Sequence, residues 1–331
     1  MKNKIFMIFL IKNILCFSTA KQFINRTELL LDTVFNIKIE KIENADNILE
    51  NSFNLVKKLE DRLSIFKKES EISKLNKYKK YRVSPELAEL IKKSIYISKI
   101  TEGAFDITCK KIIDLYKKKS QQNTLPTIEE INKVLKETGW EKIKINGNEI
   151  YLSGEAEIDL GGIAKGFIVD KVAEFLKSNG IKNGIINAGG DIYCWGVNQE
   201  NKNWRIGIEN PFKEDEIIGY FEITDSGIAT SGNYKRYIKI KEKKIGHIIN
   251  PKTGMPVKNT SVSVTIIGPD CATADGLATG IFVLGIEKGI KIIEKYKDFG
   301  CLIIDKGKKI YKTKNFPLLF NINPEFYILS N

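Results

Sequence analysis

A single histidine, His247, lies in the segment GHIINPKTG over residues 246–254. This segment holds too much Gly and Pro for a regular helix or a central strand, which predicts a shaped loop that presents one imidazole. Histidine exchanges a proton near neutral pH, so His247 is a candidate general base or acid. The alternative is an ordinary surface histidine with no chemical role.

The segment IDLGGIAKG over residues 158–166 places Asp159, two glycines and Lys165 where a helix is expected to begin. Free backbone N–H groups at a helix start favour anions, and Lys165 would add a positive charge beside a phosphate-bearing ligand. The spacing is neither the P-loop pattern nor the dinucleotide-binding glycine pattern. The alternative is a tight turn from strand to helix with a solvated lysine.

A second helix-length segment, DCATADGLATG over residues 270–280, carries Asp275 and Thr279 four residues apart. On a helix these two oxygens share one face. A carboxylate, a hydroxyl and nearby carbonyls form a set of hard oxygen ligands suited to Mg²⁺. Helix capping and close packing by small residues explain the same composition equally well.

Two further segments have the composition of ligand-binding turns. In TEGAFDIT, residues 101–108, Phe105 could face a planar ring and Asp106 could accept a hydrogen bond from it. The segment GIATSGNYKR, residues 227–236, is rich in hydroxyls and bounded by glycine, which is typical of a loop at a ligand's edge and also of a plain hairpin turn.

These segments need a scaffold of strands and helices, and the hydrophobic periodicity predicts one of mixed type. Helices are expected over 45–65, from Pro85 with Ser84 as N-cap, from Ile128, over 163–178 and over 270–284. Strands are expected over 29–40, over 181–195 with an internal turn, and over 261–267, with a terminal hairpin over 301–311 and an exposed loop over 117–127. This arrangement predicts an α+β fold.

The composition limits the class of protein. The chain has 331 residues, 42% of them hydrophobic, which suffices for one large domain or two intimate ones. Its formal net charge is +12, but the lysines are scattered and form no arginine cluster with interleaved aromatics, so we expect no nucleic-acid partner. A basic balance favours anionic ligands or an anionic membrane surface.

Residues 1–20 have the composition of a signal peptide: two lysines, an apolar run, and then small residues. The apolar run is shorter than the roughly 20 residues that span a bilayer, although an uncleaved N-terminal anchor in the inner membrane is an alternative. We therefore expect an exported protein of the periplasm or cell envelope, with its folded domain over residues 21–331. Cys16 leaves a lipid anchor open as a further alternative, although Leu15 stands before it where a lipoprotein signal has a small residue.

Six motifs in order, GAFDIT, IDLGGIAKGF, NAGGDIY, GIATSGNYKRY, GHIINPKTG and TADGLATGIFVLG, together resemble the ApbE family of FAD:protein FMN transferases. The resemblance extends from Leu29 to Ile304. It implies a single α+β domain with mixed and antiparallel sheets flanked by helices, and an active site in a cleft between two sub-lobes.

The resemblance also implies an activity: FAD is the substrate, Mg²⁺ the cofactor, and FMN is transferred to a threonine of an acceptor protein with release of AMP. The metal would be bound by the Gly162 carbonyl and by the side chains of Asp275 and Thr279, and His247 would accept the threonine's proton. The positions that match flavin-binding residues of the family are Leu31, Phe66, Ala104, Phe105, Asp106, Asp159, Lys165 and Ile248.

Three positions depart from the family's pattern. Asp32 replaces a glycine, Ala278 stands where some members carry a second acidic metal ligand, and Ile107 replaces a proline. Two other functions remain open at this point. One is hydrolysis of FAD to FMN and AMP at the same metal, and the other is a non-catalytic FAD-binding protein of the cell envelope.

Overall fold

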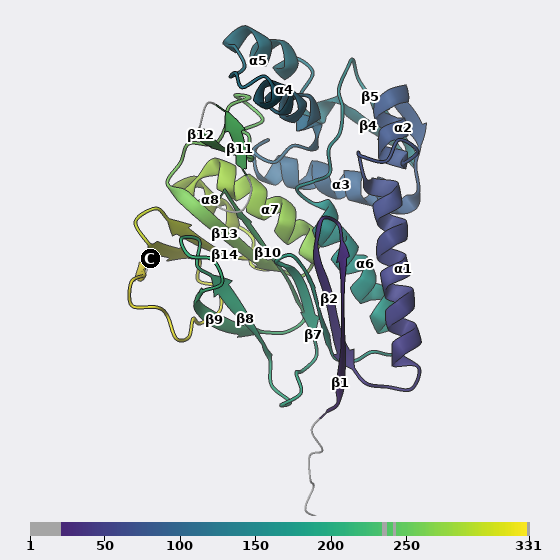
Figure 1. The fold of residues 1–331 in the computed structure, drawn as a ribbon, viewed down its shortest axis with the longest axis vertical. Helices are drawn as coiled ribbons and strands as arrows, with labels where there is room; N and C mark the ends of the chain where they lie inside the picture. The colour runs from purple at the N-terminus through teal and green to yellow at the C-terminus, as the bar shows by residue number, and fades with distance from the viewer. Residues whose placement is uncertain (1–20, 234–236, 241–242, 330–331) are drawn as a thin grey trace, which may run out of the picture.

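The computed structural model describes residues 21–233, 237–240 and 243–329. Within these residues nine strands form one large, twisted sheet, and helices pack on one of its faces (Figure 1). All neighbouring pairs are antiparallel except the last, which is parallel. The strands, in their order across the sheet, are β1 (Phe23–Leu30), β2 (Thr33–Glu40), β6 (Gly184–Ala188), β7 (Asp191–Trp195), β10 (Ser226–Gly232), β13 (Ser261–Gly268), β14 (Gly300–Asp305), β15 (Lys309–Lys312) and β16 (Tyr327–Leu329).

The sheet separates two hydrophobic cores. Along β14, Cys301 and Ile303 point into the core on the helical face, whereas Leu302 and Ile304 point into the core on the opposite face. Successive side chains of a strand alternate between faces, so a continuous apolar run is what a strand buried on both sides requires. The second core is closed by the hairpin of β8 (Trp204–Glu209) and β9 (Ile217–Ile223).

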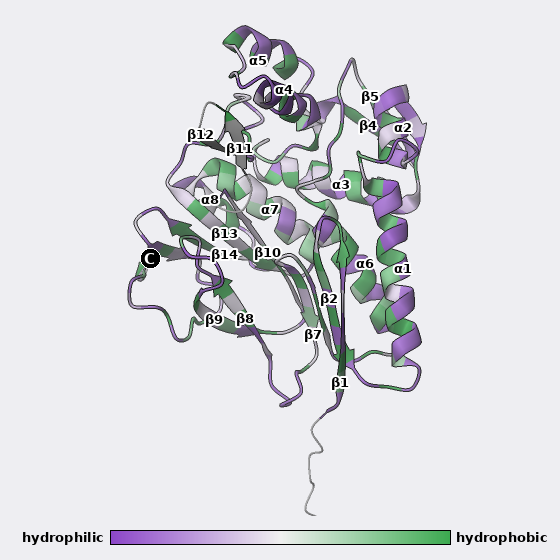
Figure 2. Ribbon diagram, in the orientation of Figure 1, coloured by the Kyte–Doolittle hydropathy of each residue, from purple (hydrophilic) through white to green (hydrophobic). Residues whose placement is uncertain are grey.

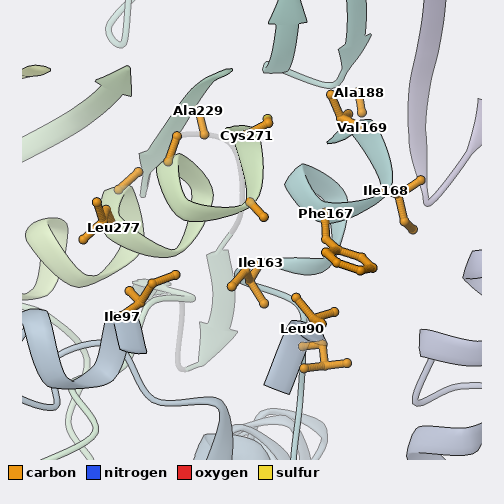
Figure 3. Close-up of a cluster of buried hydrophobic side chains, with 14 of the residues drawn as sticks. Leu90, Ile97, Ile163, Phe167, Ile168, Val169, Ala188, Ala229, Cys271 and Leu277 are labelled. Atoms are coloured by element: carbon orange, nitrogen blue, oxygen red, sulfur yellow. The ribbon is translucent and has the colours of Figure 1, made fainter. Parts of the chain in front are cut away.

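The helices of the larger core surround one central helix, α7, which is buried on nearly every side. Figure 3 shows Cys271 and Leu277 of α7 among apolar side chains that come from α3, α6 and the sheet. By contrast, α1 is amphipathic, with one apolar face toward the core and a polar face toward solvent (Figure 2). The helices are α1 (Ala45–Leu63), α2 (Glu71–Tyr78), α3 (Pro85–Ile100), α4 (Lys110–Gln121), α5 (Ile128–Leu135), α6 (Ala164–Ser178), α7 (Cys271–Leu284) and α8 (Ile286–Ile293).

Two small sheets complete the described structure. A three-stranded sheet has the order β3 (Lys80–Arg82), β5 (Glu149–Leu152) and β4 (Ile143–Asn146). A two-stranded ribbon, β11 (Tyr237–Ile240) and β12 (Lys243–Gly246), leads directly into His247.

Most of the expected elements are confirmed. The helix starts at Pro85 and Ile128 are correct, and the Ser84 side chain caps α3 as expected. The helices over 163–178 and 270–284 correspond to α6 and α7. The α+β class and the single domain are also correct, because the helices of the larger core pack against one central sheet.

Four expectations were wrong. The strand over 29–40 is a hairpin, because Leu31 and Asp32 form a two-residue turn. The loop over 117–127 starts later, since α4 extends to Gln121. Much of the hydroxyl-rich segment over 227–236 is not a loop but the central strand β10. The hairpin over 301–311 is not the last element, because β16 pairs with its second strand.

The described helices include none that is both long and apolar enough to cross a bilayer. Residues 1–20, on which the leader prediction depends, lie outside the described residues. Each of the four described cysteines is buried and none forms a disulfide.

Candidate active site

A cavity of about 1030 Å³ opens at one end of the sheet and receives side chains from segments that are far apart in the chain. Ligand pockets usually enclose about 300–1,000 Å³, so this one is large enough for a dinucleotide. All predicted site residues except Leu31 line it; they are Phe66, Ala104, Phe105, Asp106, Asp159, Gly162, Lys165, His247, Ile248, Asp275 and Thr279.

The loop before α6 is held in place by a residue that the sequence did not suggest. The buried Asn76 side chain donates to the Ile158 carbonyl at 2.8 Å and accepts from the Ile158 N–H at 2.7 Å. One residue later, the Asp159 carboxylate accepts the Gly161 N–H at 2.8 Å, which curves the chain into the helix. The first turn of α6, which has no side-chain cap, therefore lies beside the cavity.

Lys165 is the cationic centre of this wall. Its ammonium forms an ion pair with Asp191 of β7 and lies 3.8 Å from Asp275 of α7. Burial disfavours the ammonium, but the two carboxylates prevail and raise the pKa of Lys165 well above its usual value. Lys165 therefore carries a full positive charge at the cavity wall, where a phosphate group would be attracted.

The oxygens expected to bind a metal converge here. The Asp275 carboxylate accepts the Gly166 N–H at 3.3 Å, and the Thr279 hydroxyl lies 3.1 Å from that of Ser231. Gly162 is close to Thr279, because a Cβ added at Gly162 would lie 3.5 Å from the Thr279 Oγ1. This set of carboxylate, hydroxyl and backbone oxygens fits a hard divalent cation such as Mg²⁺. No cluster of three His, Cys, Asp or Glu side chains suited to a metal occurs in the described part of the chain.

The aromatic residues of the cavity differ in exposure. The Phe66 side chain is 75% exposed at the rim, and Lys117 of α4 lies 5.4 Å from its ring centroid. Phe105 is only 3% exposed and packs against Gly162 and Gly280. Phe66 is thus free to stack on a planar ring, whereas Phe105 mainly shapes the wall.

Asp106 has a structural task in addition to any contact with a ligand. Its carboxylate accepts from the Thr108 N–H at 2.8 Å, the Thr108 hydroxyl at 2.7 Å and the Trp140 N–H at 2.8 Å. Burial raises its pKa, while these donors act in the opposite direction. Asp106 therefore joins two loops at the edge of the cavity.

The loop that follows His247 is compact. Asn250 donates its N–H to the Met255 carbonyl at 2.8 Å, and Gly254 donates to the Asn250 carbonyl at 2.8 Å. Gly254 has a φ of +63° and lies against α5, where a Cβ would be 2.5 Å from Ile131. Ile249 packs between α4 side chains in a small core of its own. These contacts give His247, at the cavity wall, a well-defined backbone.

Leu31 is the exception among the predicted residues. It lies in the turn between β1 and β2, with a φ of 56°, and its neighbour Asp32 has a φ of 54°. Two positive φ values define a type I′ turn, so Asp32 adopts the conformation for which the family has a glycine. Thr33 and Val34 line the cavity, but Leu31 does not. Its contact with a ligand stays a prediction.

Sequence reasoning assigned no role to several residues of the cavity. Ser231 lies in a motif that carried the resemblance, and the Thr230 hydroxyl lies 2.9 Å from that of Thr265 across two strands. Asp191 lies in another of these motifs and reaches the cavity through its ion pair with Lys165. The cavity also has an apolar end, formed by side chains of β8, β9 and neighbouring strands, that no motif indicated: Ile185, Ile192, Ile206, Ile208, Phe221 and Ile228.

A comparison with known proteins places this geometry in a family. The family model described as "ApbE family" matches residues 31–303. The chain belongs to the ApbE family. Two relatives named FAD:protein FMN transferase, from Vibrio cholerae and Haemophilus influenzae, are 35% and 33% identical to it. The alignments cover 86% and 78% of this chain and 89% and 82% of those relatives.

Solved structures of the family have the same fold. The flavin transferase ApbE from Vibrio cholerae superposes with a TM-score of 0.80 at 32% identity, over 89% of this chain and 98% of that one. The ApbE protein from Thermotoga maritima superposes with a TM-score of 0.82 at 29% identity, over the same shares of the two chains.

Proposed function

We propose that this protein transfers FMN from FAD to a threonine of an acceptor protein and releases AMP. Membership of the ApbE family and the names of its relatives, FAD:protein FMN transferases, support this reaction. The observation that carries it is the meeting of three distant segments, around Gly162, His247 and Asp275, at one cavity. These are the segments that would bring a cation, a phosphate and a base together.

In this reaction the threonine hydroxyl oxygen attacks the phosphorus atom that becomes part of FMN. The bond between this phosphorus and the bridging oxygen breaks, and AMP leaves with the bridging oxygen. His247 accepts the hydroxyl proton, which makes the oxygen a better nucleophile. Lys165 offsets the negative charge of the diphosphate, and Phe66 stacks on the flavin ring.

Gly162, Asp275 and Thr279 would hold Mg²⁺, since their oxygens are of the type this cation prefers and they lie close together. A cation bound there supplies Lewis-acid stabilisation of negative charge on the phosphate oxygens. Asp275 matters most in this set, because it is the only one of the three that carries a charge.

Incubation of the purified protein with FAD and Mg²⁺, with and without a candidate acceptor protein, tests the proposal. We expect mass spectrometry to find the mass of FMN added to one threonine of the acceptor. Release of FMN and AMP at the same rate without acceptor would instead assign FAD hydrolysis. FAD that is bound but never cleaved would assign a binding protein.

The Asp275→Ala substitution separates catalysis from binding. We expect transfer to fall by about 100-fold or more, because the substitution removes the only charged ligand of the cation. FAD binding, measured by flavin fluorescence, should be partly retained through the cavity's other contacts. An Asp275→Ala variant with normal transfer would contradict the proposed cation site.

We also propose that the protein is exported and works in the cell envelope, with residues 1–20 as a signal peptide or an N-terminal anchor at the inner membrane. Edman sequencing of the protein recovered from the periplasm would identify the mature N-terminus. A periplasmic chain that begins near residue 21 supports cleavage. An intact N-terminus in the membrane fraction supports the anchor, and an intact N-terminus in the cytosol contradicts export.

A further inference from the structure

Helices α6 and α7 pack antiparallel, and hydrogen bonds at two positions and a packing contact just before α6 join them at regular intervals. The Gly166 N–H of α6 donates to the Asp275 carboxylate of α7 at 3.3 Å. Four residues earlier on the first segment and four residues later on the second, Gly162 faces Thr279. Four residues is close to one helical turn, so these pairs form successive rungs between the two segments.

Asp170 makes a third rung at the other end of the same series. It lies four residues after Gly166, and its two carboxylate oxygens accept the N–H groups of Cys271 and Ala272, each at 2.8 Å. Cys271 in turn lies four residues before Asp275. The rung that holds the start of α7 is therefore in register with the two rungs that carry the predicted cation ligands.

Close packing alone would not fix this register. A Cβ at Gly166 would lie 2.5 Å from the Cys271 carbonyl oxygen, and a Cβ at Gly227 of β10 would lie 2.2 Å from the Cys271 nitrogen. The start of α7 is thus wedged between α6 and β10, which sets its distance from both. Helix surfaces made of small residues offer few ridges against sliding along the axis, so directional hydrogen bonds must set the axial position.

The other polar groups at this helix start act differently. Asp270 caps its own helix by accepting the Thr273 N–H at 2.8 Å, and it moves with α7. Lys93 of α3 lies 3.0 Å from Asp270 and neutralises it. Neither group connects α7 to α6. Asp170 does so with two bonds to backbone N–H groups at the positive end of the helix, where a carboxylate binds best.

We infer that Asp170 is a positioning residue for the cation site: it holds α7 at the axial register in which Asp275 and Thr279 face Gly162. The inference rests on the proposed function, because it presumes that a divalent cation binds at Asp275. Asp170 itself is separated from the cation ligands by a full helical turn and does not touch substrate. Asp170 sets the positions of Asp275 and Thr279 and does not change their chemistry as ligands.

The Asp170→Asn and Asp170→Ala variants test this inference in the full chain. Asparagine keeps one acceptor oxygen and the size of the side chain, whereas alanine removes both bonds. We expect the dissociation constant for Mg²⁺, from calorimetric titration with MgCl₂ in the absence of FAD, to rise about tenfold for asparagine and more for alanine. Affinity for FAD alone, without Mg²⁺, should be unchanged.

Thr127→Ala is the control, since it removes a side-chain acceptor from the start of α5, which takes no part in the cation site. It should lower the unfolding temperature but leave Mg²⁺ affinity unchanged. If the Asp170 variants lose stability like the control and bind Mg²⁺ normally, the inference is wrong. If Asp170→Ala does not fold, the Asp170→Asn titration decides alone. Failure of the unmodified protein to bind Mg²⁺ would overturn the proposed cation site itself, and with it this inference.

Discussion

The aspartates near the cavity divide into two groups by the partners they have. Asp106, Asp159 and Asp170 accept backbone N–H groups and so organise loops and helix starts. Asp191 and Asp275 face the ammonium of Lys165, and Asp275 also accepts one backbone N–H, that of Gly166. A carboxylate surrounded by N–H donors is committed to structure, whereas one paired with a mobile side chain can exchange that partner for a ligand. Asp275 is the residue from which we expect such an exchange.

The proposed role of His247 as a base gives a prediction for a single substitution. We expect His247→Ala to slow FMN transfer by about 100-fold to 10,000-fold, since a positioned base contributes this much to proton transfer. FAD affinity should change little, because the proposed base acts on the acceptor's hydroxyl and the other residues that line the cavity remain. Single-turnover transfer rates and fluorescence titration of FAD measure the two effects. Full activity of the variant would remove His247 from the mechanism.

The raised pKa of the Asp170 carboxyl predicts that the free energy of unfolding depends on pH. Burial and the nearby Asp270 raise its pKa from 3.8 to about 7, against the opposing effect of the N–H groups of Ala272 and Cys271 and of Lys93. The folded protein thus binds this proton more tightly than the unfolded chain does. The resulting stabilisation is complete below about pH 4 and is lost as the pH rises to about 7.

Urea unfolding at several pH values tests this expectation against Asp170→Asn, which cannot titrate. The free energy of unfolding of the unmodified protein should fall, relative to that of the variant, between pH 4 and pH 7. Above pH 8 the difference should be constant. Two curves that stay parallel from pH 4 to pH 8 would show that the pKa of Asp170 is not raised.

At the scale of elements, α7 is the helix on which the site depends. Its start is enclosed by α6 and β10, and glycine is required where the backbones approach most closely. A helix buried on all sides gains stability from packing and not from an amphipathic pattern. Any change that widens the gap between α6 and α7 should therefore affect both the stability of the fold and the site.

Gly166→Ala is the sharpest such change, because its new Cβ would meet the Cys271 carbonyl at 2.5 Å and the backbone has to move. We expect a loss of about 1–3 kcal/mol in the free energy of unfolding and weaker binding of Mg²⁺. Glu174→Ala, at an exposed position of the same helix, should change stability by less than about 0.5 kcal/mol. Equal stabilities of the two variants would mean that the helices separate without cost.

Local signals in the sequence predicted elements well and their contacts poorly. Ser84 followed by Pro85 marked the start of α3 because capping is a property of adjacent residues. Asn76, which holds Ile158 across 82 positions, carried no local signal, and neither did the carboxylate of Asp170. The turn at Leu31 and Asp32 was missed because leucine is rarely found at a positive φ, and Asp32 without a neighbouring glycine is a weak turn signal.

The candidate site was predicted by resemblance more than by chemistry. Composition alone left each motif with a structural explanation beside the functional one, and both explanations hold for the segment of α7. Asp270 caps this helix, small residues pack it closely, and Asp275 nevertheless faces the cavity. Asp191 shows the limit of this reasoning, since its motif was recognised but its ion pair with Lys165 needed the fold.

At the scale of the whole molecule, one sheet is shared by two cores. Leu302 and Ile303 are adjacent in β14, both are fully buried, and each belongs to a different core. Because the same strand contributes to both, neither core can come apart while the other stays intact. The protein should therefore unfold as one cooperative unit.

Alanine substitutions at these two positions test this coupling. We expect Leu302→Ala and Ile303→Ala each to cost about 2–5 kcal/mol, with a single transition in both cases. Tryptophan fluorescence and far-UV circular dichroism should report the same midpoint in urea. Separate midpoints in either variant would show that the cores unfold independently.

The four buried cysteines bear on how the chain would fold if it is exported, as proposed above. Burial raises the pKa of Cys194 to about 12 and also raises that of Cys109, so both stay protonated and out of reach of oxidants in the folded protein. Wrong cross-links can then form only before folding is complete. In an oxidising compartment, the yield of active protein would depend on the rate of folding relative to the rate of disulfide formation. A reductant present during refolding would slow disulfide formation and raise this yield.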